Sequence, residues 1–360
     1  MSLRELRRHI GRLAIVGFSG HSVPSGLRQL AAEFDLGGVI YFSRNIVEPR
    51  QVVELSREVA ALATDWPLWI SVDQEGGRVA RLKQPFTEWP PMATLGRSGD
   101  EALAGRFASA LATELLAVGI NLDYAPILDI HTNPKNPAIG DRALSDRAED
   151  VSRLGRVIVR VLQSAGVAAC GKHFPGHGDT STDSHDELPV VEHDPRRLAE
   201  VELAPFRAAI AENVATIMTA HVLALGLDEH RPASFSPIVV NEWLKQKLGF
   251  QGVVFTDDLG MKAISSTWAL PEAMVQSVAA GCDVALLCNS TVDEQVDALE
   301  ATIHAAESGR IGIKRIDDAL ARQKRIKERF FAGRRLAPPG LDVIGSADHQ
   351  AVAAAMAGWR

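Results

Sequence analysis

Cysteine is scarce in this chain, which has only three among its 360 residues: Cys170, Cys282 and Cys288. Each lies in an apolar segment with the composition of a buried strand. Their spacing suits neither a zinc site nor a disulfide framework. We therefore expect three reduced thiols in the core and no structural cross-links.

Long apolar runs and an excess of positive charge are also missing. No apolar run approaches the length that crosses a bilayer, and the run over 13–18 is too short for the core of a signal peptide. The formal net charge is −7 and no basic patch is evident, which argues against a nucleic-acid partner. We expect a cytoplasmic, monomeric protein that binds neither membranes nor nucleic acids.

Short apolar runs alternate with segments of helical periodicity along most of the chain. The runs predicted as strands cover 14–17, 38–42, 68–72, 120–124, 165–170, 215–219, 252–256 and 283–287. Helices are expected near 24–33, 48–63, 101–118, 148–164, 195–212, 241–248, 271–280 and 292–306. This order is typical of a parallel sheet whose strands are joined by helices.

Eight strand–helix pairs in series predict a closed parallel barrel. The strands are apolar throughout, so both of their faces are expected to be buried. An open, doubly wound sheet is the main alternative. The count of eight, and the lack of a Gly-x-Gly-x-x-Gly motif after the first strand, favour the barrel. The predicted fold class is α/β, a single-domain (β/α)8 TIM-type barrel with a C-terminal helical extension.

The part of the chain beyond the eighth pair is expected to be helical. Residues 315–331 form a basic amphipathic pattern, which could indicate a membrane surface but fits better a helix packed beside the barrel with a solvated face. A helix breaker at 337–340 precedes a small Ala-rich helix. We expect a barrel domain over 1–335 and a C-terminal tail over 336–360 packed on or near it.

Ionisable groups are concentrated in one segment, Lys-His-Phe-Pro-Gly-His-Gly-Asp-Thr-Ser-Thr-Asp-Ser-His over 172–185. It contains three of the eleven histidines and two aspartates. A Gly-rich loop that follows a buried strand and carries such groups is typical of the functional face of α/β proteins. A decorated surface loop is the alternative, but clusters of titratable groups favour a site.

Polar residues recur where the predicted strands end. They are Asp73, Asp123, Lys172 with His173, His221, and Asp257 with Asp258. In a parallel barrel the carboxyl ends of all strands open on one face, so these residues are expected to surround one pocket.

Several of these residues suit particular chemical roles. Asp257 can act as a nucleophile, a general base or a helix N-cap. Asp183 can orient the imidazole of His185 for proton transfer near neutral pH, although an Asx-turn beside a solvated histidine is an equal alternative at this point. The segment from Asp73 to Arg81 places two glycines and two arginines beside an acid, which suits a hydroxylated or carboxylated ligand but also a charged turn.

A metal site is a further possibility, since the loop holds ligand types at His173, His177, Asp179, Asp183 and His185. These residues show no compact three-ligand spacing, and no His-x-His follows the first strand. We expect neither a metal nor another cofactor.

Three motifs together resemble the β-N-acetylhexosaminidases of glycoside hydrolase family three, over about residues 10–330. They are Lys-His-Phe-Pro-Gly-His-Gly with Asp-Ser-His over 172–185, Asp-Gln-Glu-Gly-Gly-Arg-Val over 73–79, and Phe-Thr-Asp-Asp-Leu over 255–259. Thr256 stands where serine is frequent in the family, and the tail from about residue 336 matches no known part of it.

The resemblance implies a retaining exo-glycosidase that removes terminal β-linked N-acetylglucosamine. It implies that Asp257 is the nucleophile and that His185, assisted by Asp183, is the acid/base. The sugar-binding positions that it implies are Asp73, Arg81, Arg142, Lys172 and His173.

The resemblance also implies a substrate, namely N-acetylglucosaminyl-anhydromuramyl peptides released in peptidoglycan turnover. Gly176 and Gly178 are expected to act as hinges that carry His185 over the sugar and away again. The alternatives are a phosphorylase or β-glucosidase that uses the same pocket, a metal-dependent hydrolase on a barrel, and a sugar-binding protein without catalysis.

Overall fold

Eight parallel strands close into a barrel in the computed structural model, which describes residues 2–332 and 338–359. The strands are β1 (Ala14–Val16), β2 (Gly38–Tyr41), β3 (Trp69–Val72), β4 (Leu122–Asp123), β5 (Ala168–Phe174), β7 (Thr216–Thr219), β9 (Val253–Asp258) and β10 (Val284–Leu287). Their spatial order is β1-β10-β9-β7-β5-β4-β3-β2, and β1 pairs with both β2 and β10. The predicted barrel is confirmed, and the open-sheet alternative is wrong.

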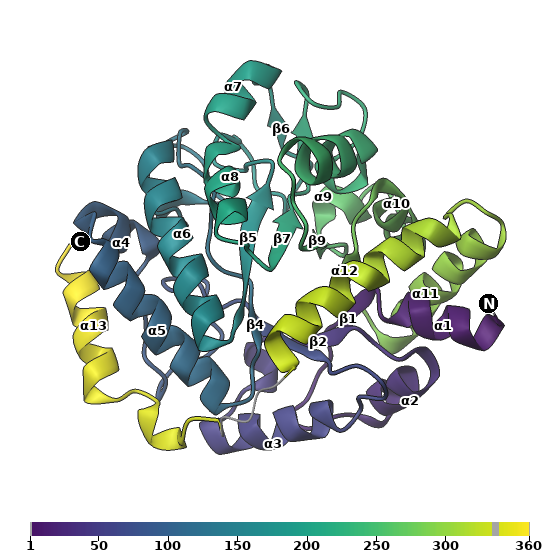
Figure 1. The fold of residues 1–360 in the computed structure, drawn as a ribbon, viewed down its shortest axis with the longest axis horizontal. Helices are drawn as coiled ribbons and strands as arrows, with labels where there is room; N and C mark the ends of the chain where they lie inside the picture. Colours follow the sequence, from purple (N-terminus) through teal and green to yellow (C-terminus); the bar gives the residue numbers. More distant parts are fainter. Residues whose placement is uncertain (1, 333–337, 360) are drawn as a thin grey trace.

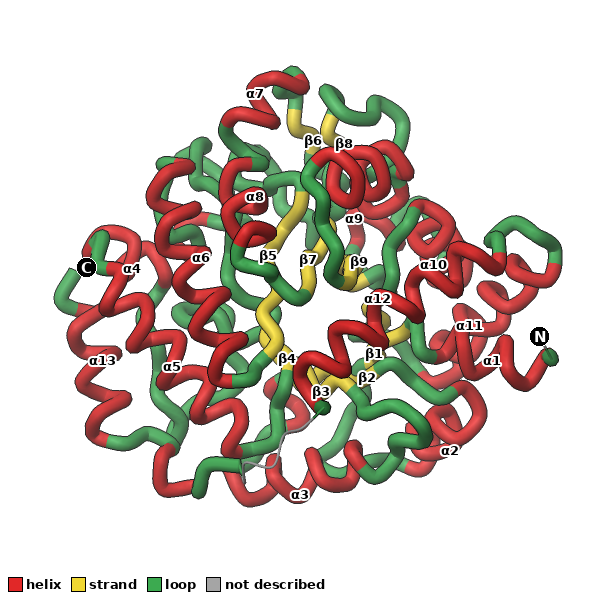
Figure 2. Tube along the Cα trace, viewed as in Figure 1, coloured by secondary structure: helices red, strands yellow, loops and turns green. Residues whose placement is uncertain are grey.

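Helices cover the outside and one end of this barrel (Figures 1 and 2). They are α1 (Leu3–Gly11), α2 (Ser25–Phe34), α3 (Pro49–Ala60), α4 (Met92–Ser98), α5 (Glu101–Ala117), α6 (Ala148–Ala165), α7 (Pro195–Glu200), α8 (Ala204–Ala211), α9 (Lys262–Ser265), α10 (Leu270–Ala280), α11 (Val292–Glu307), α12 (Ile313–Phe331) and α13 (Ala347–Ala357). Short 3-10 helices cover Ser43–Asn45, Gly140–Arg142, Ala233–Phe235 and, as η5, Leu341–Val343. A small parallel pair, β6 (Val190–Val191) and β8 (Leu223–Ala224), lies outside the barrel.

Apart from shifts of a few residues at element ends, three predicted elements differ from the structure. The single helix expected over 195–212 is two helices, α7 and α8, and Pro205 lies in the first turn of the second, where a missing N–H costs least. The helix expected at 241–248 begins earlier and is a π-helix, Ile238–Lys247. Strand β5 continues to Phe174 instead of ending before Lys172, because Lys172 still pairs with Ile127.

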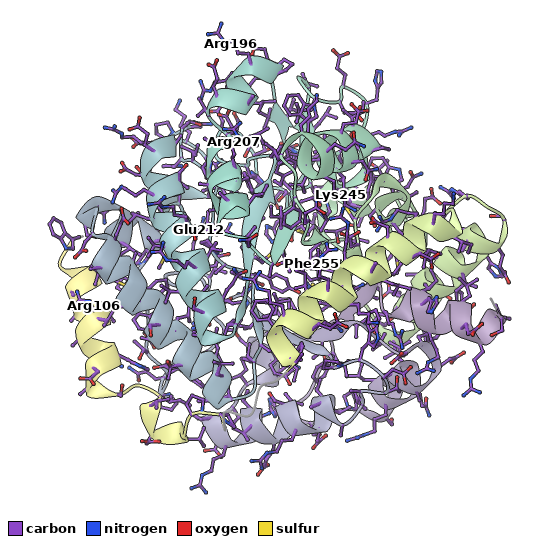
Figure 3. All side chains as sticks on the ribbon, in the orientation of Figure 1. Arg106, Arg196, Arg207, Glu212, Lys245 and Phe255 are labelled. Carbon is purple, nitrogen blue, oxygen red and sulfur yellow. The ribbon has the colours of Figure 1, made fainter. Side chains whose placement is uncertain are left out.

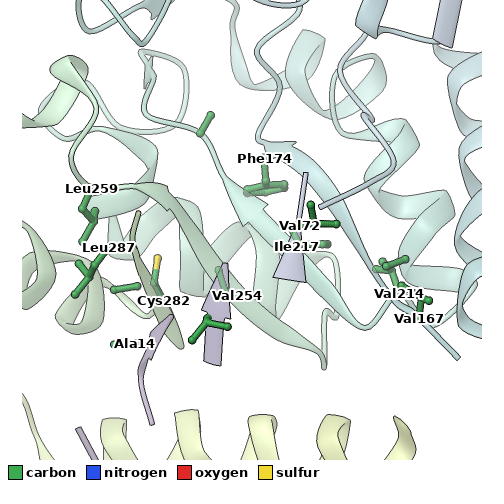
Figure 4. Packing of buried hydrophobic residues seen from close by; sticks show 14 of the residues in the cluster. Ala14, Val72, Val167, Phe174, Val214, Ile217, Val254, Leu259, Cys282 and Leu287 are labelled. Atoms are coloured by element: carbon green, nitrogen blue, oxygen red, sulfur yellow. The ribbon is translucent and has the colours of Figure 1, made fainter. Parts of the chain in front are cut away.

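The apolar core has two layers. Inside the barrel, Tyr124 and Phe255 meet edge to face with ring centroids 5.9 Å apart; Phe255 lies near the centre of the molecule in Figure 3. Outside it, strand residues such as Val72, Ile217 and Val254 belong to the cluster that packs against the helices (Figure 4). All three cysteines are buried and free, as predicted.

Helix α12 lies across the amino-terminal end of the barrel, and does not simply pack beside it (Figure 1). Nζ of Lys327 donates to the carbonyl oxygens of Gly37 and Pro67 at 2.9 and 2.6 Å, just ahead of β2 and β3. Phe330 meets Trp69 edge to face at 6.2 Å. The helix therefore closes the end of the barrel opposite the carboxyl ends of the strands. Lys327, part of its basic pattern, is bonded to backbone carbonyl groups and does not face solvent.

The C-terminal helix α13 packs on α4 and α5 (Figure 1). The boundary expected at residues 335 and 336, and the first residue of the expected helix breaker, lie outside the described residues. Within 2–332 and 338–359, no helix has the length and apolar character that a bilayer crossing requires.

Candidate active site

A cleft opens at the carboxyl ends of the strands. It consists of two adjoining cavities of about 250 Å³ each, which share Asp73, Arg81, His185 and Asp257 in their linings. The remaining predicted site residues, Arg142, Lys172, His173 and Asp183, line the second cavity. The barrel therefore brings all eight residues to one place. Asp123 and His221, which end strands and were expected around the same pocket, are fully buried and line neither cavity.

Asp257 and Asp258, at the end of β9, have opposite surroundings. The carboxylate of Asp258 accepts hydrogen bonds from two backbone amides and from the side chain of Asn289. Among the described residues, Asp257 accepts only the amide of Asp258, on Oδ1 at 2.8 Å, while its Oδ2 lies 4.0 Å from Nε2 of His173. Asp258 is thus held by the fold, whereas one oxygen of Asp257 is available in the cleft.

Asp257 remains ionised at neutral pH although its side chain is only 20% exposed. Burial raises the pKa of its carboxyl, but His173 and His221 outweigh that effect and hold the pKa below its usual range. His221 is itself buried, and burial lowers its pKa. Its Nε2 lies 3.0 Å from the carbonyl oxygen of Asp258 and its Nδ1 lies 2.8 Å from Oγ of Ser234, so the ring is fixed beside the strand end.

A buried carboxylate orients His173. Nδ1 of His173 lies 2.7 Å from Oδ2 of Asp129, which turns Nε2 toward Asp257. The backbone amide of His177 donates to Oδ1 of Asp129 at 2.7 Å. Burial raises the pKa of Asp129, but the two histidines lower it overall. Asp129 therefore stays charged and fixes both the imidazole and the start of the following loop.

Four of the predicted residues belong to a charged cluster built on Glu75. Glu75 is buried and accepts Nε and Nη2 of Arg142, both at 2.9 Å, and lies 2.6 Å from Nζ of Lys172. Lys172 also donates to Asp73 at 2.8 Å, and Arg81 lies 3.3 Å from the other oxygen of Asp73.

The charges in this cluster support one another. Burial opposes ionisation of Glu75, Lys172 and Arg142, yet their mutual attraction lowers the pKa of Glu75 and raises the pKa of the two cations. These groups remain charged at neutral pH. They present fixed donors and acceptors to the cleft, an arrangement suited to a ligand with several hydroxyl groups.

Asp183 and His185 lie on the loop that joins β5 to β6. Nδ1 of His185 lies 2.8 Å from Oδ1 of Asp183, which also accepts the backbone amide of His185 at 2.9 Å. Burial raises the pKa of Asp183, but these hydrogen bonds lower it overall. The imidazole of His185 is 71% exposed and lines both cavities. Pairing of Nδ1 leaves Nε2 for proton exchange.

The base of this loop is fixed by His177 and by close packing. Nδ1 and Nε2 of His177 lie 2.7 and 3.2 Å from the hydroxyls of Thr180 and Ser184, and burial lowers the pKa of His177 to about 4. A Cβ on Gly178 would lie 1.7 Å from the carbonyl oxygen of Ile130. Gly178 therefore serves a close backbone contact; that Gly176 and Gly178 act as hinges stays a prediction.

Glu75 and Asp129, which hold the predicted residues in place, were given no role from the sequence, and the positioning roles of His177 and His221 were not foreseen. A signal was present for Asp129, a single acid between Leu128 and Ile130. A charge inside an apolar run is costly unless it is paired, so it marks a buried network.

No metal centre forms in the described part of the chain, where no three His, Cys, Asp or Glu side chains converge as ligands. Of the ligand types considered, Asp179 lies 2.7 Å from Nε2 of His193 and 2.8 Å from Oγ1 of Thr132. His177 has both ring nitrogens within hydrogen-bond distance of hydroxyl groups.

Comparison with known proteins places these features in a family. The profile of the glycosyl hydrolase family 3 N-terminal domain matches residues 5–326. A beta-hexosaminidase of Alkalilimnicola ehrlichii is 41% identical over 284 residues, which cover 76% of this chain and 80% of that protein.

Solved structures agree with that match. A glycoside hydrolase family 3 β-N-acetylglucosaminidase from Paenibacillus sp. has a TM-score of 0.93 and 42% identity, over 100% of this chain and 69% of that one. NagZ from Neisseria gonorrhoeae, in complex with N-trifluoroacetyl-D-glucosamine, has a TM-score of 0.79 and 32% identity, over 96% and 97% of the two chains. The chain belongs to glycoside hydrolase family 3.

Proposed function

We propose that this protein is a retaining exo-β-N-acetylglucosaminidase that acts through a covalent glycosyl-enzyme intermediate. The observation that carries the proposal is that one cavity is lined both by an ionised, partly unpartnered carboxylate, Asp257, and by an exposed imidazole, His185, whose Nδ1 is held by Asp183. The names of the relatives, beta-hexosaminidase and β-N-acetylglucosaminidase, support N-acetylglucosamine as the sugar.

In the first step Oδ2 of Asp257 attacks the anomeric carbon while cationic His185 gives its Nε2 proton to the departing oxygen. Asp183 stabilises the imidazolium through Nδ1. In the second step neutral His185 takes a proton from water, the resulting oxygen attacks the anomeric carbon, and Asp257 leaves. Two inversions give net retention, and both catalytic groups return to their starting charge.

The charged cluster supplies the sugar contacts in this proposal. Asp73 and Lys172 would bind hydroxyl groups, with Arg81, Arg142 and His173 as further donors. Since Glu75 and Asp129 already fix most of these side chains, little conformational entropy is lost when the sugar binds.

We propose muropeptides as the substrate, that is, N-acetylglucosaminyl-anhydromuramyl peptides. Their peptides are anionic, and an imidazole acid/base repels an anion less than a second carboxylate would. We further propose that the enzyme is monomeric and works on these muropeptides in the cytoplasm. Its catalytic domain would cover residues 1–335 and its tail residues 336–360. Rates on anionic and neutral disaccharides, compared across salt concentrations, test the substrate class; an identical salt dependence argues against it.

Trapping tests the mechanism directly. A fluorinated N-acetylglucosaminyl donor, which forms the intermediate faster than water removes it, should add one sugar to the enzyme. Digestion and mass spectrometry should place that sugar on Asp257. A label on Asp258, or no label during demonstrated turnover of an N-acetylglucosaminide, would overturn the assignment.

Phosphorolysis is the second candidate function. The neutral imidazole of His185 in the second step would not repel an incoming phosphate, as a carboxylate base would. The products decide between the two: phosphate-independent release of free N-acetylglucosamine supports hydrolysis, and phosphate-dependent release of the sugar 1-phosphate supports phosphorolysis.

A further inference from the structure

The tail, defined here as residues 341–357, meets the loop that carries part of the candidate site. That loop joins β3 to α4 over residues 73–91 and contains Asp73 and Arg81. The two segments meet at Pro85, where a Cβ on Gly345 would lie 2.2 Å from the carbonyl oxygen. Gly345 has a φ of +62°, so both its conformation and its contact require glycine.

One buried carboxylate, Glu114 on α5, joins the two segments. From the loop, the amide and the hydroxyl of Thr87 donate to Glu114 at 3.0 and 2.6 Å. From the tail, the amide of Gly345 and Nδ1 of His349 lie 2.9 Å from Oε1. Glu114 and Thr87 are both buried. A buried carboxylate that accepts four hydrogen bonds is costly to disturb, so it fixes its donors firmly.

Hydrogen bonds within the loop connect its anchored end to the cleft. The side chain of Gln74, next to Asp73, accepts the amides of Arg81 and Leu82 at 2.8 and 3.0 Å and donates to the carbonyl of Leu82 at 2.9 Å. Further along, the amide of Gly77 donates to the carbonyl of Trp89 at 2.8 Å. The loop is thus closed on itself at its cleft end and held by Glu114 at its outer end.

We propose that Glu114 is a positioning residue and that the tail acts through it as a clamp on the sugar-binding loop. The clamp sets the positions of Asp73 and Arg81, and it gives the tail a part in substrate affinity. This inference rests on the proposed function, in which Asp73 and Arg81 bind the sugar. It assigns no chemical step to Glu114, His349 or Thr87.

Steady-state kinetics of the full-length chain test the clamp. Oε1 of Glu114 accepts three of the four donors, so Glu114→Gln places its amide N–H₂ against the Thr87 amide and should loosen the loop there. With active enzyme counted by the fluorinated sugar, KM for a chromogenic N-acetylglucosaminide should rise roughly 5- to 20-fold while kcat changes less than about twofold. Hydrogen exchange in residues 76–91 should become faster at the same time.

Two milder variants keep the test decisive if Glu114→Gln folds poorly. His349→Gln and Thr87→Val each remove one donor and should raise KM by about two- to fourfold. His304→Gln is the matched control, because His304 also pairs with a glutamate, at 3.2 Å, but on the exposed surface of α11. Its KM and its exchange in 76–91 should equal those of the wild type.

An unchanged KM in His349→Gln and Thr87→Val would overturn the clamp, even if the melting temperature fell. A loss of kcat without a change in KM would overturn it as well. If the wild type fails to turn over the glycoside, the proposed function fails instead, and exchange in residues 76–91 alone decides whether the tail holds the loop.

Discussion

Replacing Asp257 by asparagine should abolish activity and spare stability, whereas replacing Asp258 should lower stability more than activity. Asp257→Asn removes the carboxylate that attacks the sugar, and the loss in kcat should be on the order of 10⁴–10⁶-fold, as when other covalent nucleophiles are removed. Its stability should change by at most about 1 kcal/mol, because Oδ2 has no hydrogen bond among the described residues to lose.

Asp258→Asn should do the reverse, and the contacts give its size. Oδ1 accepts the amides of Gly260 and Cys288 at 3.1 and 3.0 Å, and an asparagine oxygen keeps both. Oδ2 accepts Nδ2 of Asn289 at 3.0 Å, and there the new amide brings two donors together. The side-chain amide of Asn289 cannot flip to offer its oxygen instead, because that oxygen, Oδ1 of Asn289, accepts a hydrogen bond from Arg44 at 2.9 Å.

One buried hydrogen bond is therefore lost, at a cost of about 1–3 kcal/mol. With an unfolding entropy of about 2.1 cal/mol/K per residue, 360 residues correspond to a fall in melting temperature of about 1–4 °C. Turnover of a chromogenic N-acetylglucosaminide and thermal unfolding, measured on both variants, form the assay. Turnover retained in Asp257→Asn, or a larger loss of turnover in Asp258→Asn, would refute the reasoning.

Three further outcomes follow from the same contacts. Glu75→Gln leaves the buried cations Arg142 and Lys172 without a charged partner and should lower the free energy of unfolding by about 3–5 kcal/mol. Unfolding in guanidinium measures this, with the exposed Glu149→Gln as the control. A loss below about 1 kcal/mol would contradict the prediction. His185→Ala should lower kcat/KM by about 10²–10⁴-fold on N-acetylglucosaminyl disaccharides. On substrates with activated leaving groups the loss should be far smaller, because such groups need no proton. Equal losses of kcat/KM on both kinds of substrate would rule out His185 as the acid. Burial lowers the pKa of His177 to about 4. As the pH falls, His177 therefore takes up a proton in the unfolded chain at a higher pH than in the folded protein. Stability should thus decrease from about pH 6.5 to pH 4, by about 3 kcal/mol in total, and His177→Gln should flatten that slope between pH 7 and 5.

Much of the fold could be predicted from the sequence because its signals are local. Apolar runs and helical periodicity are properties of short segments, so the eight strands and their order followed from them. The position of the site followed as well, since strand ends of a parallel barrel share one face. Asp73, Lys172, His173 and Asp257 line the cleft for that reason, whereas Arg81, Arg142, Asp183 and His185 reach it from the segments that follow the strands.

The remaining features depend on register, which short segments do not determine. Lys172 lies within β5 because its backbone pairs with Ile127 from a loop far earlier in the chain. The contrast between Asp257 and Asp258 arises from hydrogen bonds to the end of β10, and the role of Asp129 arises from its approach to His173. The isolated acid in an apolar run marks Asp129 as buried and paired, but the partners in these contacts have no trace in local composition.

The pairing of β1 with β10 has a consequence for synthesis of the chain. Ala14 finds its partner Ala285 only after nearly the whole barrel has been translated. At a synthesis rate of about 5–20 residues per second, the apolar edge of β1 that later pairs with β10 stays unpaired in the nascent chain for tens of seconds. Molecular chaperones that shield such edges are therefore expected to raise the yield of folded protein, and slower translation near the last strand to lower it.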